Sequence, residues 1–236
     1  MRVMIRRLST LFRRAKHVFR TEGLIPLLWQ GFTFLAGYFF RYRTYYLYEY
    51  TLGQGDEAEF TPKIQDFTLE VVSTNQQADE LAARGLDFRL QDSHASRRLD
   101  QGAIAFCIFV GRELVHIGWV ALTQEAKESL NEPRYKVDFA SGEVCVGGVW
   151  TNPKYRGRGL MTYGYFKRSQ FLKQRGKVLG RASVIKGSIA AQRVHAKFNS
   201  RVYAEVRYLK ILCWKFWKEK SPAPDKERRG WDSNPR

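Results

Sequence analysis

The sequence lacks paired cysteines, a long uninterrupted apolar run, and enough acidic residues to balance its basic ones. Its 236 residues hold 40 Lys and Arg against 23 Asp and Glu, which gives a formal net charge of +17 and a pI near 10.0. A surplus of this size indicates a polyanionic neighbour, such as nucleic acid, an anionic membrane or an acidic substrate. The length suits one ordinary domain with appendages and a sizeable core.

The three cysteines are too few and too scattered to organise a fold. Cys107, Cys145 and Cys213 stand alone, without the C-x-x-C or Cys/His spacing of a zinc site, so we expect no metal. Nothing in their number or spacing indicates a disulfide framework. Cys107 and Cys145 lie inside apolar runs, where a reduced and buried thiol is the ordinary outcome. We therefore expect a protein of a reducing compartment, the cytoplasm.

The most apolar stretch is too short to cross a membrane. Residues 24–40 hold no charge, but a spanning helix needs about 20 consecutive apolar residues, and Pro26, Gln30, Gly31 and Gly37 interrupt this run. No small-residue cleavage site of the A-x-A kind follows it, which argues against a cleaved secretory signal. An organelle transit peptide stays open, because such peptides are also rich in Arg and poor in acids.

Residues 1–52 are expected to form a basic helical arm. Apolar side chains recur with helical spacing from Met4 to Phe19, arginines occupy the other faces, and tyrosines crowd the end of the arm. Such an arm suits insertion of residues 1–50 into one leaflet of an anionic membrane, which would place the protein at the inner face of that membrane. The alternative is that the arm packs on the globular domain or on a partner. A homodimer of the chain is a separate hypothesis.

A globular domain is expected from residue 67 to residue 213, after a polar linker at 53–66 and before a disordered, charge-rich tail at 221–236. Alternating and helical apolar patterns predict a mixed α/β order with an early hairpin and late βαβ units. The predicted strands are 67–73, 103–110, 114–122, 144–150, 178–185 and 203–212. The predicted helices are 75–83, capped near Thr74, then 160–174 and 188–198.

The most informative segment joins a predicted strand to a predicted helix. Apolar residues 144–150 lead into a polar turn and then into Arg156-Gly157-Arg158-Gly159, and the helix begins at the next residue. A glycine-spaced loop at a helix N-terminus binds phosphates through free backbone N–H groups and the positive end of the helix dipole. A lone G-x-G is weak, because glycine turns close many hairpins, but its place between strand and helix strengthens the prediction.

This segment resembles the main motif of the GNAT superfamily of N-acetyltransferases, R/Q-x-x-G-x-G/A at a strand-to-helix turn. Arg156 matches its first position and Gly159 its middle glycine, whereas Met161 replaces the last small residue and narrows the loop. A second motif of the superfamily, N-x-x-A-x-x-x-Y, reads here with Ser188 for the Asn and His195 for the Tyr. The resemblance covers residues 67–212 and implies an α/β fold with the mixed sheet of a GNAT-like acyl-CoA N-acyltransferase.

The resemblance also implies that acetyl-CoA is the co-substrate. Its diphosphate would lie on the loop amides, and its pantetheine arm would run along the strand like an added strand, near a backbone N–H that polarises the thioester. Ser188 would offer the pantetheine arm one amide contact fewer than Asn. The residues implied in acetyl-CoA binding are Val149, Trp150, Arg156, Gly157, Arg158, Gly159, Leu160, Met161 and Ser188.

Three residues are candidates for proton transfer, each with a structural alternative. His195 stands where the superfamily often has a tyrosine that protonates the leaving thiolate, and an imidazole with a pKa of about 6.5 suits that role. Glu143 and His116 are candidates for the base that deprotonates the amine, directly or through water. The alternatives are packing roles for both histidines and a solvated strand end for Glu143.

The sequence therefore predicts an N-acetyltransferase that moves an acetyl group from acetyl-CoA to a primary amine. The basic arm favours a substrate made at a membrane, such as an amino sugar of an envelope polysaccharide precursor. A rival hypothesis is a module that binds nucleic acid through residues 41–50 and 214–220, although the uncharged residues 24–40 have no use in such binding. A third is a GNAT domain that binds acyl-CoA without turnover and serves as a scaffold.

Overall fold

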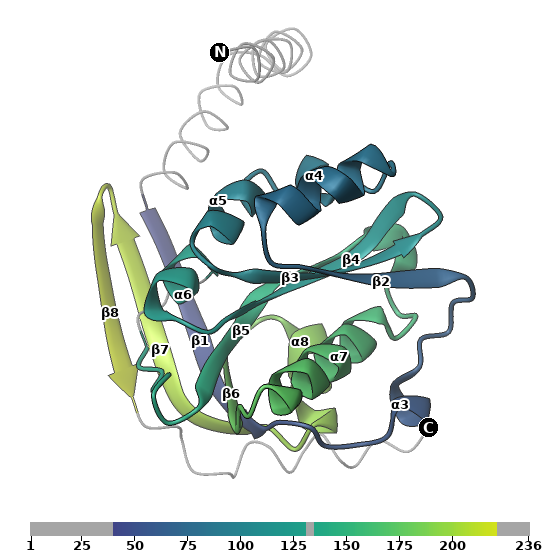
Figure 1. Cartoon of the computed structure of the whole chain (residues 1–236). Helices are drawn as coiled ribbons and strands as arrows, with labels where there is room; N and C mark the ends of the chain where they lie inside the picture. The colour runs from purple at the N-terminus through teal and green to yellow at the C-terminus, as the bar shows by residue number, and fades with distance from the viewer. Residues whose placement is uncertain (1–39, 131–134, 221–236) are drawn as a thin grey trace, which may run out of the picture. The chain divides into compact units, whose positions relative to one another are not determined.

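The computed structural model describes residues 40–130 and 135–220 (Figure 1). Most of the predicted arm, residues 1–39, and the predicted tail at 221–236 lie outside this part. No helix among the described residues is both long enough and apolar enough to cross a membrane.

The chain forms two compact units. Among the described residues, the larger consists of residues 44–207 with 217–220, and the smaller of residues 40–43 with 208–216. The larger unit holds the predicted strand–loop–helix segment and the helices described below.

One mixed sheet runs through the described residues, with eight strands in the order β2-β3-β4-β5-β6-β1-β7-β8. The pairs β2–β3, β3–β4 and β4–β5 are antiparallel, β5 and β6 are parallel, and β6 and β1 are antiparallel. The strands are β1 Phe40–Thr51, β2 Phe67–Val72, β3 Ile104–Val110, β4 Glu113–Ala121, β5 Glu143–Thr151, β6 Leu179–Ile185, β7 Arg201–Ile211 and β8 Trp214–Lys220.

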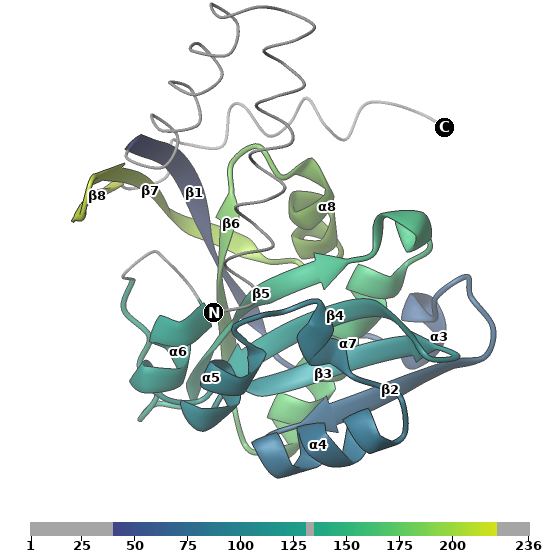
Figure 2. The ribbon, with the colours of Figure 1, turned by 90° about the horizontal axis from the view of Figure 1, so that it is seen from above.

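Helices cover both faces of this sheet in the larger unit (Figures 1 and 2). Helices α4, α5 and α6 pack on one face around Trp119, and α7 and α8 pack on the other around Phe166. The predicted mixed α/β class is confirmed. The helices are α3 Glu57–Phe60, α4 Asn75–Ala83, α5 Ala95–Asp100, α6 Gln124–Leu130, α7 Leu160–Gln174 and α8 Ile189–Lys197, with 3-10 turns η1 Phe88–Leu90 and η2 Pro153–Tyr155.

Local sequence signals explain several element boundaries. The Oγ1 of Thr74 accepts a hydrogen bond from the backbone N–H of Gln77 at 3.2 Å, so α4 begins where the cap predicts. The predicted hairpin turns at Gly111, whose φ of +57° lies in the left-handed region that glycine tolerates. The helix predicted at 160–174 is α7, with the same bounds.

The last part of the predicted arm is a strand inside the sheet. β1 lies between β6 and β7 and pairs with β6 over residues 45–51. Tyr48 and Tyr50 pack toward α7 and α8, and Leu47 packs on the opposite face, because successive strand residues point to opposite sides. The prediction of a helical arm as far as residue 52 is therefore wrong for residues 40–51, where an aromatic-rich alternation is a strand pattern.

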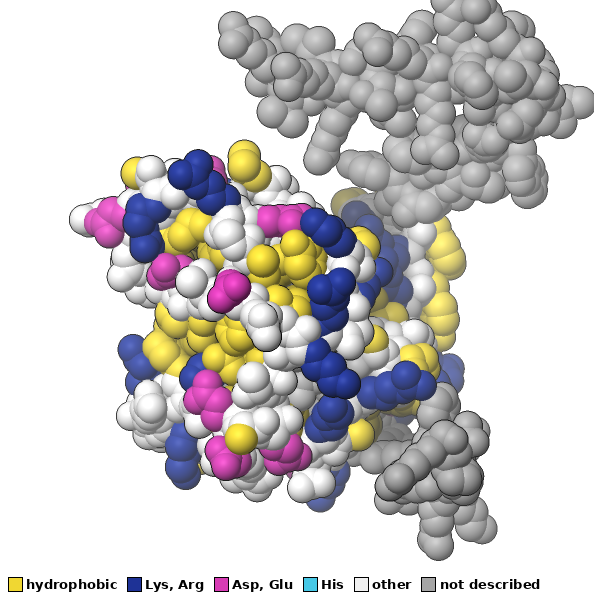
Figure 3. Space-filling model, turned by 90° about the vertical axis from the view of Figure 1, so that its right-hand side faces the viewer, with side chains coloured by type: hydrophobic (Ala, Val, Ile, Leu, Met, Phe, Trp, Pro, Cys, Tyr) yellow, Lys and Arg dark blue, Asp and Glu magenta, His cyan; other side chains and the backbone are white. Residues whose placement is uncertain are grey.

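The basic surplus does not make every face positive. On the face shown in Figure 3, Asp and Glu side chains lie among Lys and Arg, with exposed apolar side chains between them. Several acidic groups of the larger unit are paired with cations, among them Glu57 with Lys167 at 2.8 Å and Glu205 with Lys186 at 3.3 Å. Positive and negative charges are therefore interspersed on the described surface.

Candidate functional site

Strand β5 loses one of its two neighbours half-way along. Its parallel pairing with β6 covers only Glu143–Val146, whereas its antiparallel pairing with β4 continues to Thr151. From Gly147 onward, none of the described residues pairs with the β6 side of the strand. Backbone N–H and C=O groups on such an edge need partners, and an extended ligand supplies them in the way an added strand does.

A β-bulge lies in the same segment. The register between β4 and β5 shifts between Ile117 and Trp119, opposite Gly148, whose φ is +58°. An added Cβ at Gly148 would lie 2.8 Å from Cδ1 of the buried Trp119 ring, so only glycine fits. Bulges bend a strand and redirect its side chains, and here the redirected residues are Val149 and Trp150.

The loop after β5 is anchored on strand β4. The Oδ1 of Asn152 accepts a hydrogen bond from the N–H of Lys154 at 3.1 Å, which caps η2. The Nδ2 of Asn152 and the hydroxyl of Tyr155 donate to the two carboxylate oxygens of Glu113 at 3.0 and 2.8 Å. These bonds, the one from Tyr155 foremost, lower the pKa of Glu113. These hydrogen bonds fix the position of residues 152–155, from which the chain continues to Arg156.

Residues 156–159, here called the glycine loop, turn the chain into α7. Gly157 and Gly159 have φ values of +77° and +86°, and no atom lies within 4 Å of a Cβ built on Gly157. The first intrahelical bond runs from the N–H of Tyr163 to the C=O of Gly159 at 2.9 Å. The backbone N–H groups of residues 160–162, in the first turn of α7, thus have no intrahelical acceptor. The helix dipole makes this end of the helix positive. The residues and the space fit a phosphate group.

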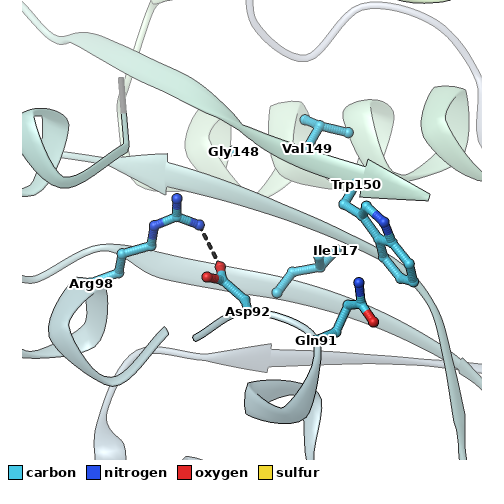
Figure 4. Close-up of a pocket in the computed structure, with 7 residues that line it drawn as sticks. All are labelled: Gln91, Asp92, Arg98, Ile117, Gly148, Val149 and Trp150. Atoms are coloured by element: carbon cyan, nitrogen blue, oxygen red, sulfur yellow. Dashed lines mark hydrogen bonds and ion pairs between the residues drawn. The ribbon is translucent and has the colours of Figure 1, made fainter. Parts of the chain in front are cut away.

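A pocket of about 280 Å³ lies against the bulged strand (Figure 4). Its walls come from three parts of the larger unit: the segment between η1 and α5, helix α5, and strands β4 and β5. Figure 4 shows the Trp150 ring beside the Gln91 amide and an ion pair between Asp92 and Arg98 across from them. The lining residues are Gln91, Asp92, Arg98, Ile117, Gly148, Val149 and Trp150.

Three features now coincide on β5: a parallel partner that ends at Val146, a bulge at Gly148, and a glycine loop leading into α7. The open edge of β5 and the glycine loop before α7 are the two features that the sequence motif implied.

Comparisons with known proteins give the following. No family model and no curated protein matches the chain. A GNAT-family acetyltransferase from Colwellia psychrerythraea is similar at 12% identity and a TM-score of 0.46, covering 73% of this chain and 57% of that one. A GCN5-related N-acetyltransferase from Kribbella flavida is similar at 15% identity and a TM-score of 0.43, covering 88% of this chain and 66% of that one. Another from Sphaerobacter thermophilus is similar at 16% identity and a TM-score of 0.46, covering 82% of this chain and 57% of that one. The chain thus spans less than two thirds of each of these proteins.

The residues predicted to bind acetyl-CoA gather at one end of the mixed sheet. Val149 and Trp150 lie on the open part of β5, and the glycine loop follows directly. Ser188 is the residue before α8, just beyond the end of β6, so it borders the opening between β5 and β6. Met161 is partly buried and packs against the core cluster around Phe166.

Glu143 is held in an ion pair at the other end of β5. Its carboxylate oxygens accept hydrogen bonds from Nη2 and Nε of Arg181 at 2.6 and 2.7 Å, and these bonds lower the pKa of Glu143. At about 3.3 Å per strand residue, Trp150 lies roughly 23 Å further along. Glu143 therefore does not reach the pocket, and its predicted role as a base is corrected to that of a structural ion-pair partner.

His116 is buried beneath α7 on the side of the sheet opposite Ile117 and the pocket. Its Nδ1 lies 2.9 Å from Oγ1 of Thr151, and its Nε2 faces Gly164 of α7, where an added Cβ would lie 2.6 Å away. Burial, and then the charge of Arg168, hold its pKa well below the ordinary 6.5. The predicted base role is corrected here too, because the ring packs between strand and helix.

His195 lies among aromatic rings. Its ring stacks on Tyr48 with centroids 4.2 Å apart, and its Nδ1 lies 3.2 Å from Oγ of Ser200 and 3.3 Å from the hydroxyl oxygen of Tyr165. Burial, and then the charge of Arg168, lower its pKa to about 3. The imidazole is therefore neutral at pH 7, and the geometry favours the packing alternative over proton donation to a thiolate.

A buried arginine beneath the sheet escaped the sequence analysis. Arg168 of α7 is 0% exposed, and within residues 40–130 and 135–220 its three side-chain nitrogens have no hydrogen-bond partner. A Cβ added at Gly118 would lie 1.9 Å from Nη1 of Arg168, so the guanidinium fits only because residue 118 has no side chain. Burial lowers the pKa of Arg168 to about 10, opposed by Tyr50 and Tyr165.

The pocket residues Gln91, Asp92 and Arg98 were also missed. They belong to a polar stretch, and they meet β5 only because α5 packs on the sheet. The sequence held one signal for the position of this pocket, the adjacent glycines Gly147 and Gly148 within an apolar strand. A glycine inside a strand often marks a β-bulge or a point where a ligand or another backbone segment comes close.

Proposed function

We propose that the chain is an N-acetyltransferase that uses acetyl-CoA and accepts a primary amine in the pocket beside Trp150. The supporting observation is that one strand segment serves both sites. Residues 148–150 line the pocket, their strand has an open edge, and the same strand leads into the glycine loop. Donor and acceptor would therefore meet at the bulge.

The reaction is an acyl substitution at the thioester carbonyl carbon, and it requires two proton transfers. The amine nitrogen attacks the thioester carbonyl, the C–N bond forms, the C–S bond breaks, the amine loses a proton and the thiolate gains one. A backbone N–H of the open β5 segment would stabilise the oxyanion, since fixed donors act where charge develops. Among the described groups facing the pocket, Asp92 is the one carboxylate, so proton removal would run through it or through water.

The donor side would be held by the glycine loop and its flanking residues. Backbone amides of residues 156–161 would bind the diphosphate, and the exposed Arg156 and Arg158 side chains would add positive charge. Nε of Arg156 already donates to the C=O of Thr151 at 3.3 Å, which places its guanidinium beside the loop. Ser188 would contact the pantetheine arm from across the opening.

Reversing the charge at the glycine loop tests this placement. Arg156→Glu is expected to weaken acetyl-CoA binding at least about tenfold in calorimetric titration of the full chain, because a carboxylate would repel the diphosphate. Arg175→Glu makes the same change at the exposed C-terminal end of the same helix and should leave the affinity unchanged. Equal affinities of the two variants would contradict the phosphate site. Tight binding by the wild type without acetyl transfer to any amine would identify the scaffold alternative.

The pocket chemistry favours an amino sugar as acceptor. Sugars pack an apolar face on an aromatic ring and use hydroxyl groups for hydrogen bonds, and the pocket offers the Trp150 ring, the Gln91 amide and the Asp92–Arg98 pair. The Asp92 carboxylate would also attract the ammonium form of the amine. An envelope polysaccharide precursor made at the cytoplasmic side of a membrane fits this chemistry.

Removing the carboxylate charge tests the acceptor assignment. Asp92→Asn is expected to lower kcat/KM for glucosamine about tenfold with unchanged acetyl-CoA affinity, because a charged hydrogen bond to the acceptor is lost. Asp79→Asn on α4 breaks another Arg–Asp pair, the one with Arg89 of η1, and should change neither quantity. If wild-type enzyme acetylates peptides and not amino sugars, the sugar assignment is wrong while the acetyltransferase assignment stands.

A further inference from the structure

The smaller unit exposes a concentrated apolar surface, here called the hairpin surface and defined as the exposed side chains of residues 40–43 and 208–216. Of the eleven exposed large hydrophobic side chains among the described residues, six lie in these two short stretches. They are Phe40 (54% exposed), Tyr42 (54%), Ile211 (42%), Leu212 (58%), Trp214 (68%) and Phe216 (49%). Scattered single apolar residues are normal on a surface, but such a concentration marks an interaction site.

The tip of this surface has an unusual turn. Strands β7 and β8 are joined by two residues, Leu212 and Cys213, and Leu212 has a φ of +56°. Two-residue hairpins normally place Asn or Gly in this left-handed conformation, which is unfavourable for a branched side chain. Leu212 is also not buried in the fold. Neither the turn nor the packing of the unit explains a leucine here, which indicates a function at the tip.

The charge of the hairpin surface restricts its partner. The same two stretches contain Arg41, Arg43, Lys210 and Lys215 and no Asp or Glu. A second copy of the chain would bring like charges together, and nucleic acid offers nothing to an exposed leucine. An anionic bilayer interface accommodates both features, because aromatic and aliphatic side chains enter between the headgroups while basic side chains meet the lipid phosphates.

We propose that the hairpin surface binds an anionic lipid bilayer by inserting the Leu212–Cys213 tip and the flanking Trp214 and Phe216 rings into its interface. The uncharged sequence 24–40 leads directly into Phe40 of this surface, so the most apolar part of the sequence ends where the exposed apolar side chains begin. This membrane attachment is separate from the acetyl-CoA chemistry and does not depend on it.

The exposed cysteine at the tip provides a local test. Cys213 is exposed, whereas Cys107 and Cys145 are buried, so a thiol-reactive, polarity-sensitive fluorophore will label the tip of the full-length native chain. Vesicles of phosphatidylcholine with phosphatidylglycerol should shift its emission to the blue and sediment the protein, and pure phosphatidylcholine should do neither. The double variant Leu212→Asn/Trp214→Thr is expected to bind the anionic vesicles at least about tenfold more weakly.

A matched substitution controls for the loss of an exposed apolar residue. Leu90→Asn removes an 87% exposed leucine from the larger unit and should leave vesicle affinity unchanged. Urea unfolding transitions that match the wild type in both variants would show that they are folded, whatever the vesicle result. Sedimentation without an emission shift would assign binding to residues 1–39 and overturn the proposal. A shift that depends on protein concentration without vesicles, or retention on DNA only, would overturn it as well.

Discussion

Gly148→Ala is expected to lower kcat/KM for acetyl transfer by about 100-fold. The added methyl group would lie 2.8 Å from the Trp119 ring, which is 0% exposed, packs under the Arg98 guanidinium with 5.3 Å between that group and the ring centroid, and has no room to retreat. Strand β5 would therefore shift at the bulge, and a displacement of about 1 Å at a reacting centre costs roughly 100-fold in rate. Steady-state kinetics with acetyl-CoA and an accepted amine measures this directly.

Gly111→Ala is the matched control. Gly111 has nearly the same φ, +57° against +58°, but no atom lies within 4 Å of its added Cβ. The Gly111→Ala variant should lose about 1–2 kcal/mol of unfolding free energy, because alanine disfavours the left-handed backbone conformation. Its kcat/KM should equal that of the wild type. If Gly148→Ala retained wild-type kcat/KM while losing stability, the bulge would be a folding feature and not part of the reacting centre.

The protein is expected to lose about 3 kcal/mol of unfolding free energy between pH 7.5 and pH 5.5. His116 and His195 are buried and neutral, with pKa values lowered first by burial and then by Arg168, in His195 to about 3. In this window the unfolded chain takes up a proton at each histidine with a pKa near 6.5, and the folded chain does not. Each therefore destabilises the fold by about 1.4 kcal/mol as the pH falls, and the full stability is present above the unfolded pKa.

Urea unfolding at several pH values checks this slope. His195→Gln should remove about half of the pH dependence in the same window, whatever its effect on stability at pH 7.5. His94→Gln makes the same substitution at an exposed histidine and serves as the comparison. A slope that stays the same in His195→Gln would mean that this imidazole is protonated in the folded protein, which would reopen its role as a proton donor.

Most elements of the larger unit could be predicted from local pattern. Two apolar runs on either side of the turn at Gly111 gave β3 and β4, and a capping threonine gave the start of α4. Gly176, two residues beyond the last residue of α7, marked the end of that helix. Strand β1 was misjudged because Tyr42, Tyr45 and Tyr48 were interpreted as membrane-facing rings. Only the pairing with β6, far away in sequence, shows that two of these three tyrosines are buried.

The candidate site divides in the same way. The glycine loop was predictable because its function depends on consecutive residues, so the spacing of Gly157 and Gly159 is itself the signal. The pocket was not, because Asp92 and Trp150 are brought together by packing and no spacing relates them. Burial also decided the histidines. A sequence shows that His116 and His195 exist, but only their surroundings show that both are held neutral.

The position of β1 has a consequence for how the chain is made. The first described strand to leave the ribosome is an interior strand, and its partner β6 is synthesised more than 100 residues later. Until then, a tyrosine-rich strand with two unpaired edges is open to association with other chains. The sheet must be completed by the return of its N-terminal strand after synthesis of the C-terminal half, a late non-local step that slows folding. Any fragment that begins after residue 52 would lack this strand and leave β6 with an unpaired edge.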